Sequence, residues 1–474
     1  MPSVTRVVII GGGPGGYEAA LVARQLGGEG TLIDTDGLGG SAVLTDCVPS
    51  KTLIATAEVM TSVAESGELG IRFGSRNNTD AETAVHVDLA AVNARVLDLA
   101  ARQSADITDR LIDKGVTIVR GRGRLAGPER VVAKTEDDVQ VFEPDVVLVA
   151  TGAHPRVLPD AVPDGERILT WTQVYALQEL PEKLIVVGSG VTGAEFASAY
   201  DALGAEVVLV SSRDRVLPGE DADAAQVLED VFARRGLTVL GKSRAESVVR
   251  DGDGVVVRLT DGREITGSHC LLAVGSIPNT SDIGLAGAGV TLDRGGFITV
   301  DKVSRTSARG IYAAGDCTGV MMLASVAAMQ GRIAMWHALG DAVSPLDLKV
   351  VSGNVFTAPE IATVGMSQAQ ADVAMPKVAT VQLPLQGNPR AKMQGLRDGF
   401  VKVFCLPVTG IVVGGVVVAP RASELIYPLT IAVSERLTVD QVAHSFTIYP
   451  SVSGSLAEAA RQLHLHGADL VPKE

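Results

Sequence analysis

Short runs of consecutive apolar residues recur along the chain, and each predicts a strand that is buried on both faces. The first run covers residues 7–10 (Val-Val-Ile-Ile) and leads into a glycine-rich turn and a helix expected over 17–26. The turn contains Gly11, Gly13, Pro14, Gly15 and Gly16. A strand, a Gly-x-Gly-x-x-Gly turn and a helix in this order form the fingerprint of a dinucleotide-binding fold, in which phosphate lies at the helix N-terminus.

A second copy of this pattern lies further along the chain. Residues 184–187 (Leu-Ile-Val-Val) precede a turn and a helix expected over 194–203. This turn contains Gly188, Gly190, Val191 and Gly193. One fingerprint alone is a weak indication, but two in one chain indicate two bound dinucleotides. Each copy is followed by another apolar strand that ends in a small-residue turn, the first at Thr151 and Gly152 and the second at Gly275.

The pattern changes after about residue 350, where apolar residues alternate with others along the expected strands. Residues 400–404 and 410–418 are typical of an antiparallel sheet with one solvated face. The predicted fold class is therefore α/β, with two Rossmann-like dinucleotide-binding domains followed by a C-terminal α+β domain.

Composition narrows the function. The 474 residues suit about three domains, and the formal charge of −14 argues against nucleic acid as a partner. The four cysteines have no metal-ligand spacing, so we expect no metal site and a reducing compartment. The first residues run directly into a strand, which leaves no room for a signal peptide, and no apolar run reaches membrane-spanning length. We therefore expect a cytoplasmic protein without a transmembrane segment.

Residues 39–51 read Gly-Gly-Ser-Ala-Val-Leu-Thr-Asp-Cys-Val-Pro-Ser-Lys. This stretch resembles the Gly-Gly-Thr-Cys-x-x-x-x-Cys-Ile-Pro-Ser-Lys signature of the flavoprotein disulfide reductases, the family of dihydrolipoamide dehydrogenase and glutathione reductase. Ala42 stands at the first cysteine, so Cys47 has no partner and the reactive disulfide is lost. The resemblance spans nearly the whole chain. It implies FAD at the first fingerprint, NAD(P)H at the second, and a homodimer whose active site is completed across the interface.

The resemblance also implies where the domains and the second FAD motif lie. The FAD-binding domain would consist of residues 1–152 and 276–349, with the NAD(P)-binding domain (153–275) inserted and a dimerisation domain (350–474) at the end. Gly315 and Asp316 resemble the second FAD motif, in which the carboxylate accepts a hydrogen bond from a ribityl hydroxyl. Ser325, Val326 and Ala327 fall in a helix start that resembles the one facing the isoalloxazine.

The residue that ends the second strand of each dinucleotide fold distinguishes one nucleotide from another. Asp34 ends the first such strand and suits the unphosphorylated ribose of FAD. At the same offset from Gly188 comes Ser211, followed by Ser212 and Arg213. Hydroxyl donors and positive charge without a carboxylate favour a 2′-phosphate. We expect NADPH, with NADH as the alternative.

The family's thiol chemistry needs a base from a His-Pro-Thr-x-x-Glu motif near the chain end. Here Tyr449 takes the place of the His and Gly454 that of the Glu. Tyrosine is a poor base at neutral pH but a competent hydrogen-bond donor. By contrast, Lys51 and Glu195 remain at the positions where the family places an ion pair beside the flavin. The sequence therefore predicts intact hydride transfer and lost dithiol chemistry.

These residues predict an FAD-dependent NAD(P)H:quinone oxidoreductase, in which Lys51, Glu195 and Tyr449 are the catalytic residues. Hydride passes from NADPH to FAD, and two electrons then pass to a quinone that approaches beside Ala42. One alternative is a soluble pyridine nucleotide transhydrogenase, a branch of the family that also lacks the cysteine pair. A second alternative is a flavin-bearing interaction subunit or redox sensor without turnover, which would use Cys47 as its reactive group.

Overall fold

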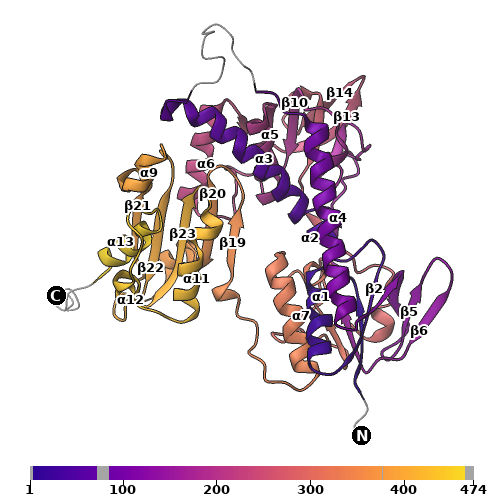
Figure 1. Cartoon of the computed structure of the whole chain (residues 1–474). Coiled ribbons are helices and arrows are strands. Elements are labelled where there is room, and N and C mark those ends of the chain that lie inside the picture. Colours follow the sequence, from indigo (N-terminus) through magenta and orange to yellow (C-terminus); the bar gives the residue numbers. More distant parts are fainter. Residues whose placement is uncertain (1–3, 72–84, 376, 465–474) are drawn as a thin grey trace.

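The computed structural model describes residues 4–71, 85–375 and 377–464. Residues 1–3, which belong to the segment where we expect no signal peptide, lie outside the described residues. Figure 1 shows three α/β units, and the long helix α4 (Leu89–Asp113) runs between two of them. The α/β fold class, with two Rossmann-like domains and a C-terminal domain, is confirmed. The boundaries at residues 152, 275 and 349 stay predictions.

The first unit is built on a five-stranded parallel sheet with the order β18-β7-β1-β2-β3. Its strands are β1 (Arg6–Ile10), β2 (Glu29–Asp34), β3 (Thr117–Arg120), β7 (Val146–Val149) and β18 (Ile311–Ala313). Helices α1 (Pro14–Gln25) and α7 (Ala324–Ala338) pack against each other beside it. Helix α1 starts at Pro14 and not at residue 17 as expected, because proline is well suited to the first turn, where its missing N–H is not needed.

The second unit repeats this plan with the sheet order β12-β11-β10-β16-β9. Its strands are β9 (Ile168–Thr170), β10 (Lys183–Val187), β11 (Glu206–Val210), β12 (Thr238–Leu240) and β16 (His269–Leu272), and its helices are α5 (Val191–Leu203) and α6 (Ala222–Arg235). Helix α5 begins at Val191, within the second fingerprint and three residues before the expected start.

Small antiparallel sheets complete these two units. Their strands are β4 (Arg122–Leu125), β5 (Val131–Lys134) and β6 (Val139–Phe142), then β13 (Ala245–Asp251), β14 (Gly254–Leu259) and β15 (Glu264–Gly267), and the pair β8 (Ala153–Pro155) and β17 (Ser276–Pro278). The connecting helices are α2 (Gly40–Leu44), α3 (Cys47–Glu65), η1 (Ser66–Leu69), η2 (Val174–Ala176), η3 (Ala286–Ala288), η4 (Asp316–Thr318) and η5 (Leu348–Val350). The pairing of β8 with β17 places the two chain crossings between the units side by side.

The C-terminal unit holds an antiparallel sheet with the order β19-β20-β23-β22-β21. Its strands are β19 (Ser352–Val355), β20 (Glu360–Gly365), β21 (Ala379–Pro384), β22 (Phe400–Cys405) and β23 (Val412–Ala419). Its helices are α8 (Gln368–Val373), η6 (Leu385–Gly387), α9 (Pro389–Met393), α10 (Ala422–Leu425), α11 (Tyr427–Ser434), α12 (Val439–His444) and α13 (Gly454–Gln462).

The expectation of one solvated sheet face is wrong for the central strands of this unit. Every residue of β22 is buried. Val401 and Val403 face the unit's own core, whereas Phe400 and Phe404 join the core of the second unit. The C-terminal sheet is therefore packed between its own helices and the second dinucleotide unit.

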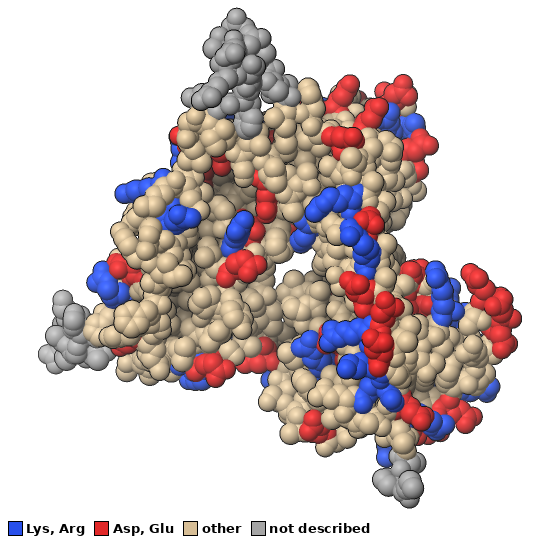
Figure 2. Space-filling model, in the orientation of Figure 1, with Lys and Arg blue, Asp and Glu red and all other residues tan. Residues whose placement is uncertain are grey.

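Charge is mixed over the face shown in Figure 2, where acidic and basic side chains alternate along the surface. In the part of the chain that the structure describes, no helix is long and apolar enough to cross a bilayer. The cytoplasmic location stays a prediction.

His269, the first residue of β16, gives a prediction about stability. It is 7% exposed, and its Nε2 lies 3.0 Å from Nη1 of Arg167. Burial, together with the positive charge of Arg167, lowers the pKa of His269 to about 4. The unfolded chain therefore binds a proton at His269 more readily than the folded protein does. The stability that this difference provides is fully present above pH about 6.5 and is lost as the pH falls towards the pKa of the folded state.

We expect His269→Gln to flatten this pH dependence. Between pH 6.5 and pH 5, the wild-type free energy of unfolding should fall by about 2 kcal/mol more than that of the variant, from the linkage of one shifted proton. Urea unfolding at the two pH values measures the difference. Parallel pH profiles for the two proteins would contradict the assignment.

Candidate functional site

The centre of the candidate site is an ion pair between helices of the first and second units. Nζ of Lys51, in the first turns of α3, lies 2.7 Å from Oε2 of Glu195 on α5. Glu195 is 3% exposed, and a carboxylate so deeply buried needs a charged partner. Its second oxygen, Oε1, accepts a hydrogen bond of 2.8 Å from the backbone N–H of Phe356, just after β19. Two predicted catalytic residues are thus brought together, and the C-terminal unit holds the pair in place.

Lys51 is held as a cation. Its Nζ lies 4.9 Å from the centroid of the Phe356 ring. Burial acts to lower the pKa of Lys51, but the charge and hydrogen bond of Glu195 outweigh it, so the pKa is raised. A fixed positive charge at this place favours negative charge on a neighbouring ring system.

Cys47 opens helix α3 and is a free thiol. The other three cysteines, Cys270, Cys317 and Cys405, are also free and are buried. Burial, followed by the charge of Asp46, raises the pKa of Cys47 to about 12. The thiol therefore stays protonated at neutral pH, and a protonated thiol is a poor nucleophile.

Asp46 is a site residue that the sequence reasoning missed. It is the N-cap residue of α3, yet its carboxyl makes no hydrogen bond to the first turn of that helix. Burial raises the pKa of Asp46 against the opposing charge of Lys51. Burial and the nearby Asp46 also raise the pKa of Asp316 to about 6. An acid directly before the motif cysteine was the signal available in the sequence.

The first fingerprint forms a cradle that fits the pyrophosphate and ribose of FAD. Gly13 caps α1 without a side-chain bond, and a Cβ there would meet nothing within 4 Å. The helix N-terminus is thus open to a phosphate group. Oδ2 of Asp34 accepts a hydrogen bond of 2.6 Å from the backbone N–H of Gly12, which places the carboxylate at the edge of this cradle.

The remaining predicted FAD residues lie around this cradle. A Cβ on Gly15 would come within 3.2 Å of the carbonyl oxygen of Ala327, so α1 and α7 are in close contact. Gly315 donates its backbone N–H to Gln330 at 2.8 Å, beside Asp316. Within the first turn of α7, Val326 and Ala327 are buried and Ser325 is exposed.

Thr151 and Gly152 lie at the crossing between the units. The hydroxyl of Thr151 donates to the carbonyl of Asn279 at 2.7 Å. The carbonyl of Gly152 accepts the backbone N–H of the same asparagine at 2.9 Å. Gly275 has a φ of +96° and lies one residue before β17 at the return crossing.

The second fingerprint forms a similar cradle, suited to a nicotinamide dinucleotide. Gly190 caps α5 and has nothing within 4 Å of a Cβ position, whereas a Cβ on Gly193 would meet the carbonyl oxygen of Gly188 at 1.8 Å. Only glycine allows this close approach of helix and strand. Val191, at the start of α5, is 40% exposed.

Ser211 differs from the expectation that its hydroxyl faces a phosphate. It is fully buried, and its Oγ lies 2.6 Å from Oγ of Ser189. The hydroxyl also donates to the carbonyl of Arg213 at 3.2 Å, so it stabilises the loop that follows β11. Ser212 and Arg213 are exposed and remain the candidates for contact with a 2′-phosphate.

Tyr449 is not brought to Lys51 within this chain. It is 82% exposed and lies in the C-terminal unit beside Phe446 and Ile448, which are exposed as well. Its predicted role therefore depends on a second subunit.

Residues 5–331 match the model of the pyridine nucleotide-disulphide oxidoreductases, and residues 351–460 match the dimerisation domain of these proteins. The chain belongs to this family. Its members use FAD and NAD(P)H, and both cradles fit these cofactors.

Curated relatives of this chain include proteins with two different names. The chain is 55% identical over 473 residues to a Mycobacterium tuberculosis protein named NAD(P)H dehydrogenase (quinone), covering 98% of this chain and 94% of the relative. It is 32% identical over 461 residues to dihydrolipoyl dehydrogenase of Zymomonas mobilis, covering 96% of each chain. The chain is therefore a flavoprotein oxidoreductase by family.

Two solved structures of family proteins have the same fold. The crystal structure of LpdA from Mycobacterium tuberculosis matches with a TM-score of 0.92 and 54% identity, over 98% of this chain and 100% of that chain. RclA from Escherichia coli, a flavoprotein disulfide reductase, matches with a TM-score of 0.86 over 98% of this chain and 100% of its own. At 23% identity, the second match shows the fold alone.

The ion pair gives a direct prediction for this family member. We expect Lys51→Met to slow hydride transfer from NADPH about a hundred-fold, because the preorganised charge beside the flavin is lost. Bleaching of the flavin absorbance after rapid anaerobic mixing measures this step. Lys183→Met, which removes the cation of the partly exposed Lys183–Glu206 pair, is the control. Equal rates in the Lys51 variant and the control would refute the role of the pair.

Proposed function

We propose that the protein is an FAD-dependent NAD(P)H:quinone oxidoreductase without disulfide reductase activity. The observation that carries this proposal is the Lys51–Glu195 ion pair beside a single protonated thiol, Cys47. Bound FAD supplies the chemistry of accepting a hydride and passing on two electrons. The residues present support the first half of a disulfide reductase reaction and lack the parts for the second half.

Two features argue against dithiol exchange. A disulfide needs two sulfur atoms, and the place of the first cysteine is taken by the methyl group of Ala42. Exchange also needs a thiolate, whereas burial and the charge of Asp46 hold the pKa of Cys47 at about 12. The same protonation argues against a redox sensor that reacts at Cys47.

A quinone suits the vacated position because it is flat and accepts two electrons without covalent catalysis. Ala42 lies in the short helix α2 and is half-buried, and its methyl group is smaller than the cysteine side chain that the family signature has there. The name of the Mycobacterium tuberculosis relative, NAD(P)H dehydrogenase (quinone), supports the same class of acceptor.

We propose a homodimer in which Tyr449 of the partner subunit lines the acceptor pocket. Phe446, Ile448 and Tyr449 form an apolar segment that is more than four-fifths exposed in the single chain. Such a segment is typical of a surface that a partner covers. The match to the family's dimerisation domain supports this arrangement.

We propose NADPH as the preferred reductant. Ser212 and Arg213 are exposed at the end of β11, and no carboxylate stands at the position of Ser211 to repel a 2′-phosphate. The nearby Asp214 is exposed as well and limits the expected preference over NADH.

A comparison of acceptors tests the function. The purified holoenzyme should oxidise NADPH rapidly with menadione and slowly with lipoamide, because neither a dithiol nor its base is present. Turnover with thio-NAD should also be slow, because the proposed acceptor is a quinone and not a second nicotinamide nucleotide. Steady-state turnover with each acceptor at a fixed NADPH concentration measures the difference. Rapid reduction of thio-NAD with negligible menadione turnover would indicate a transhydrogenase, and lipoamide turnover at menadione rates would refute the loss of dithiol chemistry.

Reduction of a quinone also consumes two protons, and we propose Asp46 as a proton source. Its carboxyl is adjacent to Cys47 and is not used to cap α3. Burial raises the pKa of Asp46, so the group carries a proton at higher pH than an ordinary aspartate does. A carboxylic acid in this state can serve as a general acid.

We expect Asp46→Asn to lower kcat for menadione at least ten-fold and to remove the alkaline limb of the pH profile, because a general acid is active only while it is protonated. Asp88→Asn is the matched control, because Asp88 is also an N-cap aspartate but its carboxyl accepts a hydrogen bond from Ala91. If the two variants share the wild-type pH profile, Asp46 does not supply the proton.

A further inference from the structure

Lys402 is a charged residue in an apolar interface between two units. It lies in the middle of β22 and is 1% exposed. Because side chains alternate along a strand, Lys402 shares its face with Phe400 and Phe404, which pack into the core of the second unit. A lysine at such a position costs free energy unless its charge is matched.

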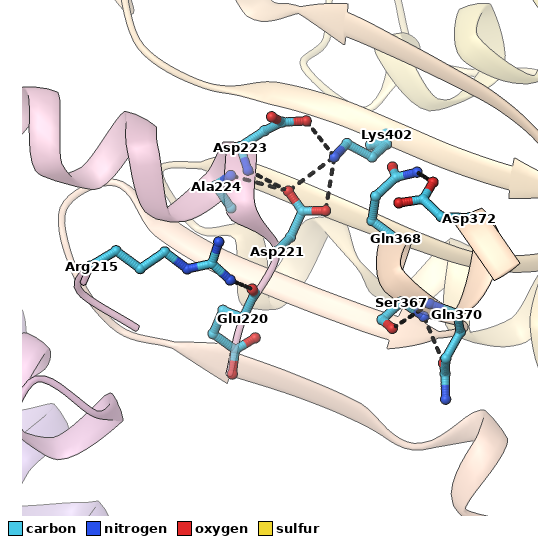
Figure 3. A network of polar contacts seen from close by, with 10 residues as sticks. All are labelled: Arg215, Glu220, Asp221, Asp223, Ala224, Ser367, Gln368, Gln370, Asp372 and Lys402. Atoms are coloured by element: carbon cyan, nitrogen blue, oxygen red, sulfur yellow. Dashed lines mark hydrogen bonds and ion pairs between the residues drawn. The ribbon is translucent and has the colours of Figure 1, made fainter. Parts of the chain in front are cut away.

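The carboxylates that match this charge lie at the start of α6 in the second unit. Nζ of Lys402 lies 3.0 Å from Oδ1 and 2.8 Å from Oδ2 of Asp221, as Figure 3 shows. It also lies 2.7 Å from Oδ2 of Asp223. The side chain of Asp221 is 3% exposed and that of Asp223 is 58% exposed. The pair with Asp221 is therefore the buried part of this link.

Asp221 connects this ion pair to the backbone of the second unit. Its Oδ1 accepts hydrogen bonds from the backbone N–H groups of Asp223 (3.0 Å) and Ala224 (3.1 Å), so it caps α6. Lys402 thus fixes the carboxylate that begins this helix. The point where the loop from β11 enters α6 is held from the C-terminal unit.

Several hydrogen bonds hold the loop between β11 and α6. The Arg215 guanidinium donates to the carbonyls of Pro218 (3.3 Å) and Glu220 (3.2 Å). Figure 3 shows the bond to Glu220, the residue directly before Asp221. The backbone N–H of Leu217 donates to the carbonyl of Ser189 in the second fingerprint at 2.8 Å. Leu217 has a φ of 49°, a conformation that leucine keeps only where its surroundings impose it.

We infer that Lys402, acting through Asp221, is a positioning residue for the loop of residues 211–220, which holds the adenosine end of the nicotinamide nucleotide. The inference rests on the proposed placement of NAD(P)H at the second fingerprint. The loop is fixed to Ser189 through Ser211 and Leu217, to the backbone of Lys242 through the carbonyl of Arg213, and to the C-terminal unit at Asp221. Loss of the attachment at Asp221 should loosen Ser212 and Arg213 without changing the Lys51–Glu195 pair.

The test measures nucleotide binding apart from turnover. Calorimetry on the FAD-loaded holoenzyme gives the dissociation constant of adenosine 2′,5′-bisphosphate. We expect Lys402→Met to raise this constant and the KM for NADPH about five-fold, a change typical of couplings carried by packed networks, and to leave kcat for menadione within about two-fold. Asp223→Asn, which alters only the exposed partner, should change the constant less than two-fold.

A second variant guards against misfolding. Lys402→Met alone leaves a buried carboxylate unpaired, whereas Lys402→Met with Asp221→Asn removes both charges and keeps an N-cap side chain on α6. The double variant should show the same five-fold rise. An unchanged dissociation constant in the double variant would overturn the inference, as would an equal rise in Asp223→Asn.

A different result would contradict the proposed preference for NADPH. If the wild-type protein binds adenosine 2′,5′-bisphosphate no better than 5′-AMP, the preference for NADPH is wrong. The ratio of variant to wild-type dissociation constants for 5′-AMP then tests the role of Lys402 in the same way, with the same expected rise.

Discussion

The Lys51–Glu195 ion pair joins helices of the two dinucleotide units, and its geometry depends on all three parts of the chain. Lys51 lies in the first turns of α3, Glu195 is buried in α5, and the backbone of Phe356 fixes the second oxygen of the carboxylate from the C-terminal unit. Removing one partner of such a pair leaves a buried charge without compensation. The packing of the three units therefore sets where the positive charge lies, and this charge is the part of the site suited to hydride transfer.

The proposed loss of disulfide reductase chemistry beside this pair rests on the protonation of Cys47 as much as on the sequence. Cys47 is a thiol whose pKa is about 12 owing to burial and to the charge of Asp46. Burial is the larger of these two causes, and burial also raises the pKa of the Asp46 carboxyl. The protonated thiol and the proposed proton donor therefore have one physical origin, the burial of the start of α3.

The sequence predicted the two fingerprint folds well, because their strand, turn and helix are local patterns with strict steric demands, as at Gly193. It also paired Lys51 with Glu195 through the family resemblance, which the structure bears out as a contact of 2.7 Å. Ser211 and Lys402 show which features could not be predicted from the sequence. The direction of the Ser211 hydroxyl depends on Ser189, and the burial of Lys402 depends on how two units pack. Neither long-range contact leaves a pattern in one sequence.

The central claim is that the reduced protein stores electrons on the flavin alone and not on a cysteine pair. Anaerobic titration of the holoenzyme with NADPH tests it most directly, because a flavin takes up two electrons and a redox disulfide two more. The account predicts complete bleaching of the flavin with about one equivalent of NADPH and no long-wavelength thiolate–flavin absorbance. Uptake of a second equivalent, or the appearance of that absorbance, would contradict it.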